Sequence, residues 1–195
     1  FFKSLYPFCL SNNPKYKSIA GAAGGFVLIE TSVLWNLGGF SSLKNALIDD
    51  CTLAKLVKKT GGNTWIGLSK GIRTRRSYYN LSNIWSMVER TAFTQLNYSF
   101  PMLFICTCLM LLMFFIPILG LIFFNKIIIT ISVLSILIMG FTYYPVVKYY
   151  ELSILNSLTL PLASLLFLLM TWSSALKYII GNRSKWKGRV YKRWN

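Results

Sequence analysis

Hydrophobic positions along the chain form short mixed segments in the first half and long unbroken stretches in the second. Three stretches without charge cover residues 100–124, 127–147 and 152–176. A helix needs about 20 apolar residues to cross the hydrocarbon core of a bilayer. Three such stretches in near succession favour membrane-spanning helices over buried core helices of a water-soluble protein.

Two short strands are expected before residue 70. Residues 20–30 pass from small residues into an apolar run, and residues 63–69 form a second short run. Strand and helix patterns alternate across residues 1–99, which indicates an α/β layer. This region is short for a sheet covered on both faces, so we expect the chain to hold the C-terminal part of such a layer.

Two helices are expected in the same region. Leucine and valine residues recur at helical spacing across residues 51–59, and a Gly-Gly pair follows as a stop. The lysines of this helix are expected on its solvent side: Lys55, Lys58 and Lys59. A second helix is expected over residues 81–96, leading to the first apolar stretch.

Charge is distributed unevenly. The chain has 21 lysines and arginines, 5 acidic residues and no histidine, which gives a net charge of +16. Few of these charges fall in residues 100–176, whereas the end of the chain, residues 177–195, is strongly basic. Such a composition is typical of an integral membrane protein, and the basic tail favours the cytoplasmic side.

The adjacent carboxylates Asp49 and Asp50 are the first candidates for chemistry. They stand at the start of the predicted helix 51–59, where backbone N–H groups and the helix dipole favour negative charge. A simple N-cap is the structural alternative, but a cap needs one acid and not two. A second carboxylate is suited to accept a proton from a hydroxyl or to hold a cation.

Arginines and glycines supply two further candidate groups. Guanidinium groups bind phosphates through bidentate bonds, and three lie within four residues: Arg73, Arg75 and Arg76. Contact with anionic lipid headgroups is the alternative, and no module for nucleic acid is present, so nucleic acid is not an expected partner. Glycines allow a ligand to approach the backbone closely, although turns use them equally: Gly24, Gly25, Gly38 and Gly39.

The absence of histidine excludes several kinds of site. A Ser-His-Asp or Cys-His site cannot form within this chain. The four cysteines form no C-x-x-C pair, so we expect free thiols and no zinc site. The remaining set of carboxylate, arginines and glycines suits transfer from a phosphate-bearing donor.

The order of these residues resembles a known family. The strings "AAGGFVLIE", "LGGF" and "LIDDCTLAKLVKKTGG" are similar to the second half of the catalytic domain of family 2 glycosyltransferases. The strings "WIGLSKGIRTRRSYYNLSNIWSMVERTAFTQLNYS" and "WKGRVY" resemble the hopene-associated branch, linked to hopanoid biosynthesis, with ceramide glucosyltransferases as more distant relatives. The resemblance implies the C-terminal portion of a GT-A nucleotide-sugar transferase domain, which is an α/β fold, followed by about three to four membrane helices.

The resemblance also implies roles for the candidate residues. Asp50 would be the general base that deprotonates the acceptor hydroxyl, with inversion at the sugar carbon, and Asp49 would support its position. The four glycines would surround the donor sugar and the acceptor. Relatives carry a Q/R-x-x-R-W motif that holds the diphosphate, of which Arg90 alone remains here, and the arginine cluster at Arg73 would share that role. The implied partners are a nucleotide sugar, a lipid acceptor and the membrane.

Further expectations concern the donor and the membrane. The resemblance implies a divalent metal, Mg²⁺ or Mn²⁺, held by a D-x-D motif that does not occur in this chain, so the 195 residues alone should be inactive. We expect a bacterial-type inner membrane, with the catalytic portion 1–99 and the tail 177–195 both facing the cytoplasm. That arrangement needs an even number of crossings, and Pro117 and Gly120 are candidate breaks in the first stretch. The alternatives are a non-catalytic integral membrane protein and a degenerate transferase relative.

Overall fold

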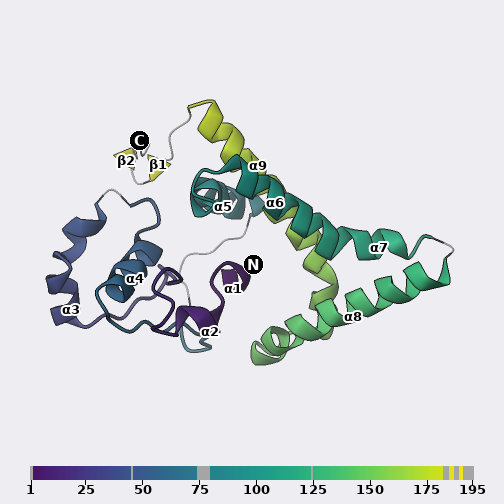
Figure 1. The fold of residues 1–195 in the computed structure, drawn as a ribbon, viewed down its shortest axis with the longest axis horizontal. Coiled ribbons are helices and arrows are strands. Elements are labelled where there is room, and N and C mark those ends of the chain that lie inside the picture. The colour runs from purple at the N-terminus through teal and green to yellow at the C-terminus, as the bar shows by residue number, and fades with distance from the viewer. Residues whose placement is uncertain are drawn as a thin grey trace. The chain divides into compact units, whose positions relative to one another are not determined.

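The computed structural model describes residues 2–44, 46–73, 80–123 and 125–181, together with the backbone of residues 185–186 and 189–190. The chain divides into two compact units, residues 1–77 with 187–195 and residues 78–186. Helices make up most of the described part of the second unit, whereas the first combines short helices with irregular segments, as Figure 1 shows.

The first unit is built on short helices around a small apolar core. Its elements are α1 (Phe2–Leu5), α2 (Phe8–Ser11), α3 (Thr31–Asn36), the 3₁₀ helix η1 (Gly39–Leu43) and α4 (Asp49–Lys59). Leu34 of α3, Leu43 of η1 and Leu53 and Val57 of α4 form the buried cluster. The helix predicted over residues 51–59 is therefore confirmed as α4, which begins two residues earlier, at Asp49.

The expected α/β layer is wrong, and no GT-A domain is seen in the described residues. Residues 20–30 form a turn and an irregular segment instead of a buried strand, and Leu28 in it is 88% exposed. Residues 63–69 form no strand either. The strands of the described residues are β1 (Lys185–Trp186) and β2 (Arg189–Val190), which pair with each other. An apolar run makes a buried strand only where a neighbouring strand and a covering layer exist.

Hydrogen bonds of the Asn12 and Thr64 side chains take the place of strand pairing in residues 63–69. Asn12 Nδ2 donates to the carbonyl of Ile66 at 3.0 Å, and the N–H of Ile66 donates to Asn12 Oδ1 at 2.7 Å. Thr64 Oγ1 donates to the carbonyl of Ser11 at 3.0 Å. These bonds fix residues 64–66 to the chain around α2.

A buried lysine holds the segment before residue 20 against α4. The Lys58 side chain is only 1% exposed, so the expectation that it faces solvent is wrong, whereas Lys55 and Lys59 are exposed as predicted. Its Nζ donates to four main-chain carbonyls at 2.8 to 3.3 Å: those of Leu10, Ser11, Tyr16 and Ile19. Burial lowers the pKa of the Lys58 amine from 10.5, because desolvation disfavours its charged form. The four carbonyls compensate this cost by accepting hydrogen bonds from the three N–H groups of the amine.

The second unit contains a helix that precedes the apolar region and then three long apolar helical segments, called rods below. Its elements are α5 (Leu81–Gln95), α6 (Phe100–Met110), the π-helical turn η2 (Leu111–Phe115), α7 (Ile116–Gly120), α8 (Lys126–Tyr149), the 3₁₀ helix η3 (Ile154–Thr159) and α9 (Leu160–Ile179). The helix predicted over residues 81–96 is confirmed as α5.

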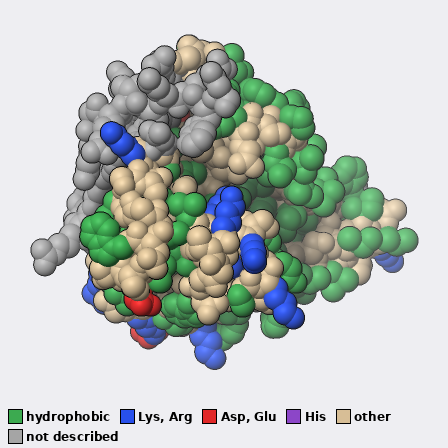
Figure 2. Space-filling view, turned by 60° about the vertical axis from the view of Figure 1, so that its left-hand side comes forward, with side chains coloured by type: hydrophobic (Ala, Val, Ile, Leu, Met, Phe, Trp, Pro, Cys, Tyr) green, Lys and Arg blue, Asp and Glu red, His purple; other side chains and the backbone are tan. Residues whose placement is uncertain are grey.

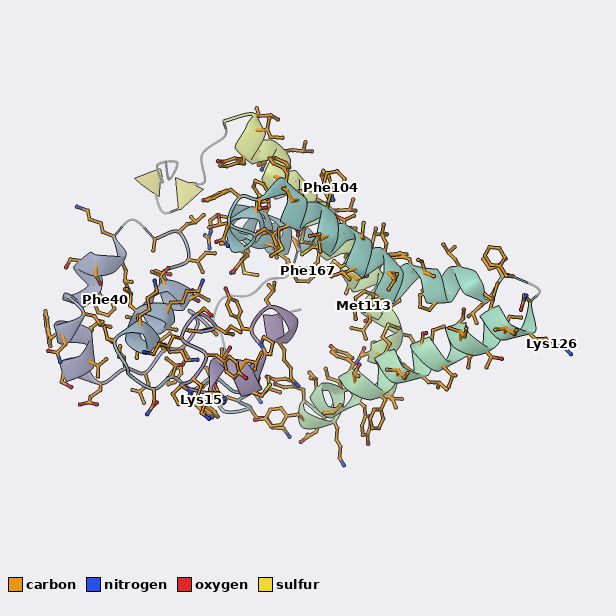
Figure 3. All side chains as sticks on the ribbon, viewed as in Figure 1. Lys15, Phe40, Phe104, Met113, Lys126 and Phe167 are labelled. Carbon is orange, nitrogen blue, oxygen red and sulfur yellow. The ribbon has the colours of Figure 1, made fainter. Side chains whose placement is uncertain are left out.

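Within the described residues, three helical rods are long and apolar enough to cross a membrane: Phe100–Gly120, Lys126–Tyr149 and Ile154–Ile179. Their side chains are mostly exposed, as expected for helices surrounded by lipid. Figure 3 shows Lys126 extending beyond the start of α8, where a lysine can keep its charge outside the hydrocarbon. The face visible in Figure 2 carries several lysine and arginine side chains and few acidic ones, in keeping with the net charge. The prediction of a membrane protein is thus supported.

The first rod is continuous through Pro117. A proline cannot donate the usual helical hydrogen bond, and its ring clashes with the preceding turn. Here the chain widens into the π-helical turn η2 directly before α7, which accommodates the proline without breaking the rod. The rod ends at Gly120, so the break expected at Pro117 is not present.

Gly120→Val is expected to destabilise the packing of α7 against α8. A Cβ added at Gly120 would lie 2.1 Å from Ser132 Oγ and 3.3 Å from Ser132 Cβ, so the Ser132 hydroxyl would have to rotate away and the helices would have to move apart by a few tenths of an ångström. We expect a loss of about 1–3 kcal/mol, typical of overpacking, measured by thermal unfolding in detergent. Gly140→Val on α8 is the matched control, because a Cβ there meets no atom within 4 Å. Equal losses for the two variants would contradict this contact.

Candidate functional site

Both candidate carboxylates lie in the first turn of α4. The N-cap position is occupied by Ile48, whose side chain makes no capping bond. Asp50 Oδ1 accepts from the N–H of Cys51 at 2.7 Å, and Asp49 Oδ1 accepts from the N–H of Asp50 at 3.1 Å. The two acids therefore satisfy free N–H groups of the helix start from inside the helix, and neither is the N-cap residue.

The two carboxylates differ in their surroundings. Asp49 is exposed to solvent, whereas Asp50 is partly buried. A Cβ added at Gly24 would lie 3.0 Å from Asp50 Oδ2 and 3.5 Å from its Cγ. The backbone of Gly24 thus lies directly against one oxygen of Asp50, which a larger residue at position 24 would displace.

The glycine-rich segment is held over α4 by neighbouring contacts. Cys51 is buried, and its Sγ donates to the carbonyl of Ala22 at 3.5 Å. Burial raises the pKa of the Cys51 thiol, which keeps it a protonated donor. The N–H of Phe26 donates to the carbonyl of Ala23 at 3.1 Å and closes a turn around Gly24. The Asp50 carboxylate and the turn at residues 23–26, called the glycine turn below, are therefore fixed to each other.

This arrangement leaves one oxygen of Asp50 for chemistry. Oδ1 bonds to the helix start, and within the described residues no hydrogen bond to Oδ2 is found. The helix N-terminus favours negative charge on the carboxylate. Such a group can take a proton from a hydroxyl that approaches along the glycine turn.

The other two candidate glycines have a clear structural task. Gly38 and Gly39 have φ angles of 85° and 67°, a backbone conformation that favours glycine, and they join α3 to η1. Gly39 also lies against the Trp35 ring, since an added Cβ would be 3.5 Å from it. Ligand contact by this pair stays a prediction.

The candidate arginines are distributed over the chain. Arg73 is exposed at the end of the described part of the first unit, and Arg75 and Arg76 lie outside the described residues. Arg90 belongs to α5 in the second unit and is partly buried. The residues that the structure brings together are Asp49, Asp50 and Gly24, with Gly25 beside them in the turn.

The described residues do not fit a divalent metal site. No group of three or more histidine, cysteine, aspartate or glutamate side chains comes together in that part of the chain. Hard divalent cations need several oxygen ligands, and the acidic pair on α4 is too small a set to supply them. The Mg²⁺ or Mn²⁺ that the resemblance implies would need ligands from elsewhere.

Comparison with protein families gives a match over almost the whole sequence. The model of the glycosyl transferase family 21 matches residues 13–194, which include the acidic pair, the glycine turn and all three rods. No curated protein and no solved structure matches the chain. The match supports a glycosyltransferase, but not the family 2 assignment or the hopanoid branch suggested by the resemblance. The chain therefore belongs to glycosyl transferase family 21.

Proposed function

We propose that this chain acts in a membrane glycosyltransferase, which transfers a sugar from a nucleotide-sugar donor to a lipid acceptor, and that Asp50 is the general base. The observation that carries the proposal is the partly buried Asp50 carboxylate held against Gly24 at the start of α4. The family match supports sugar transfer, and the membrane-length helices support an acceptor that resides in the bilayer.

The proposed reaction is a single displacement. The acceptor oxygen forms a bond to the anomeric carbon of the sugar while the bond from that carbon to the diphosphate breaks, and the configuration inverts. The acceptor proton passes to Asp50 Oδ2, and the electron pair of the broken bond leaves with the nucleoside diphosphate. Asp49 supports the position of Asp50 through its bond to the Asp50 N–H.

Further residues have proposed tasks in binding. The arginines would stabilise the negative charge of the diphosphate: Arg73, Arg75, Arg76 and Arg90. Gly38 and Gly39 would border the donor sugar or acceptor. A divalent metal, Mg²⁺ or Mn²⁺, would be held by residues outside this chain, so the 195 residues alone would not transfer sugar.

The test is transfer of radiolabel into lipid. Membranes that contain the enzyme encoded by the complete open reading frame are incubated with UDP-glucose, UDP-galactose or UDP-N-acetylglucosamine, each labelled in the sugar. We expect label from one donor in the solvent-extracted lipid, and none with the 195-residue chain alone. A degenerate or non-catalytic protein would give no labelled lipid with any nucleotide sugar.

The glycine turn gives a matched test of the site. Gly24→Ala should lower the transfer rate roughly tenfold, because its Cβ would shift the Asp50 carboxylate by a few tenths of an ångström. Gly71→Ala, outside the candidate site, should have little effect, since a Cβ there would make only an ordinary contact, 3.9 Å from Ser69 Oγ. Rates of labelled-lipid formation measure both. Similar rates for the two variants would contradict the role of Gly24.

The orientation in the membrane is also a proposal. The positive-inside rule favours a cytoplasmic position for the basic residues 177–195, and the same side is proposed for Asp50 and the first unit. One of the three rods would then not cross the bilayer fully. A tag placed after Asn195 should react with impermeant reagents from the cytoplasmic side, and reaction only from the other side would contradict the proposal.

A further inference from the structure

A buried carboxylate joins α5 to the last membrane rod. Glu89 of α5 is only 9% exposed. It accepts a hydrogen bond from Lys177 Nζ of α9 at 2.5 Å and another from Ser173 Oγ of α9. Trp85 Nε1, one turn earlier on α5, donates to the same carboxylate at 3.4 Å.

A second polar contact lies one turn further along α5. The N–H of Phe93 donates to Ser174 Oγ of α9 at 3.1 Å, and the Phe93 ring is 1% exposed. The ring belongs to an aromatic corner with Tyr98 and Tyr178, whose rings stack at 4.7 Å. Two consecutive turns of α5 are thus tied to α9.

Stability of the fold alone does not explain why the charged Glu89 carboxylate is buried between α5 and α9. Burial raises the pKa of Glu89, but the hydrogen bonds from Lys177 and Ser173 and the charge of Lys177 outweigh it, so the pKa lies below 4.5 and the carboxylate is charged. Only the Glu89 side of this ion pair is buried, since the Lys177 side chain is 53% exposed and Glu89 is 9% exposed. Such a pair stabilises a fold little more than apolar residues of similar size would. The apolar cluster of Phe93, Leu96, Leu103 and Ala175 already packs these helices. A polar group buried between helices, as the Glu89 carboxylate is, is better known for specifying one register among several.

We propose that the Glu89–Lys177 pair is an orientation lock, which fixes the rotation of α5 on α9. Apolar packing alone tolerates small rotations of α5 about its own axis. The buried Glu89 carboxylate, in contrast, can reach its hydrogen-bond partners on α9 at only one rotation. Arg90 follows Glu89 directly, so the rotation of α5 decides the direction of Arg90. Glu89 is therefore a positioning residue for Arg90, and this second step depends on the diphosphate-binding role proposed above.

The orientation lock can be tested without an activity assay, by a distance measurement between α5 and α9. Nitroxide labels are attached through p-acetylphenylalanine at Ser82 of α5 and Leu169 of α9, both exposed, in the full chain in nanodiscs. We expect one narrow distance distribution for the parent and for Lys148→Met, a control that removes an exposed lysine from α8. The apolar pair Glu89→Leu with Lys177→Met should give a broadened or shifted distribution. The conservative variant Lys177→Arg, which keeps the Glu89 carboxylate and a charged donor facing it, should keep the narrow one.

Activity of the complete enzyme tests the positioning of Arg90. The apolar pair should raise the KM for the nucleotide sugar roughly tenfold or more, with a smaller change in kcat, whereas Lys177→Arg should keep a KM close to that of the parent. An apolar pair that keeps the parent distance distribution overturns the lock. A shifted distribution with an unchanged KM overturns the role for Arg90. If no nucleotide sugar is used by the parent, the proposed function fails, and the distance measurement still decides the lock.

Discussion

Asp50→Asn is expected to transfer sugar about a hundredfold to ten-thousandfold more slowly than the parent enzyme. The amide keeps the shape of the side chain, and its oxygen can still accept from the N–H of Cys51, but it cannot take the acceptor proton. The loss should appear in kcat, measured as labelled lipid formed at saturating donor.

Asp49→Asn is the matched control for this variant. Asp49 is exposed and bonds to the Asp50 N–H, so its amide should reduce the rate by less than about tenfold. Both variants should unfold at the temperature of the parent in detergent. If Asp49→Asn were the slower enzyme, or if Asp50→Asn kept the parent rate, Asp50 would not be the base.

Lys58→Met should cause the largest loss of stability in the first unit. Methionine fills much of the same volume but leaves four carbonyls without their shared donor. Relief from burying a charge offsets part of this cost, and we expect a net loss of about 2–4 kcal/mol. Hydrogen exchange of the amides in residues 10–19, followed by mass spectrometry, measures the opening of this segment directly.

Lys55→Met and Lys59→Met are controls on the same helix. Both side chains are exposed, so each change should alter the opening free energy of residues 10–19 by less than about 0.5 kcal/mol. Equal exchange in all three variants would show that the carbonyl contacts of Lys58 do not hold the segment.

The longer helices of this protein could be predicted from the sequence, because each carries its own signal, whereas the short helices α1, α2, α3 and η1 were not predicted. The helical spacing over residues 51–59 and 81–96 and the uncharged stretches after residue 100 correspond to α4, α5 and the three rods. Periodicity and length are local properties, and helices satisfy their backbone hydrogen bonds locally.

The strands could not be predicted in the same way. The runs at residues 20–30 and 63–69 have the composition of strands, but a strand exists only with a partner elsewhere in the chain. In the described residues, Asn12 supplies the partner groups for Ile66, and Leu28 remains exposed. A single sequence does not reveal such long-range partners.

The proximity of two candidate site residues could be predicted, whereas their roles stay predictions. The order of residues along the chain singled out Asp50 and Gly24, and the structure places Asp50 Oδ2 3.0 Å from where a Cβ on Gly24 would lie. Lys58 was misplaced because lysine usually faces solvent, although its spacing from Cys51 and Ala54 puts it on their buried face. Glu89 gave no signal, since its partners on α9 lie more than eighty residues away.

The claim that Asp50 removes the acceptor proton is tested most directly by changing the acidity of that proton. Once the labelled lipid identifies the acceptor, an analogue with fluorine beside the reacting hydroxyl makes the proton more acidic and less dependent on a base. If Asp50 is the base, the rate deficit of Asp50→Asn relative to the parent becomes roughly tenfold smaller with the fluorinated acceptor. The same deficit with both acceptors would contradict that role.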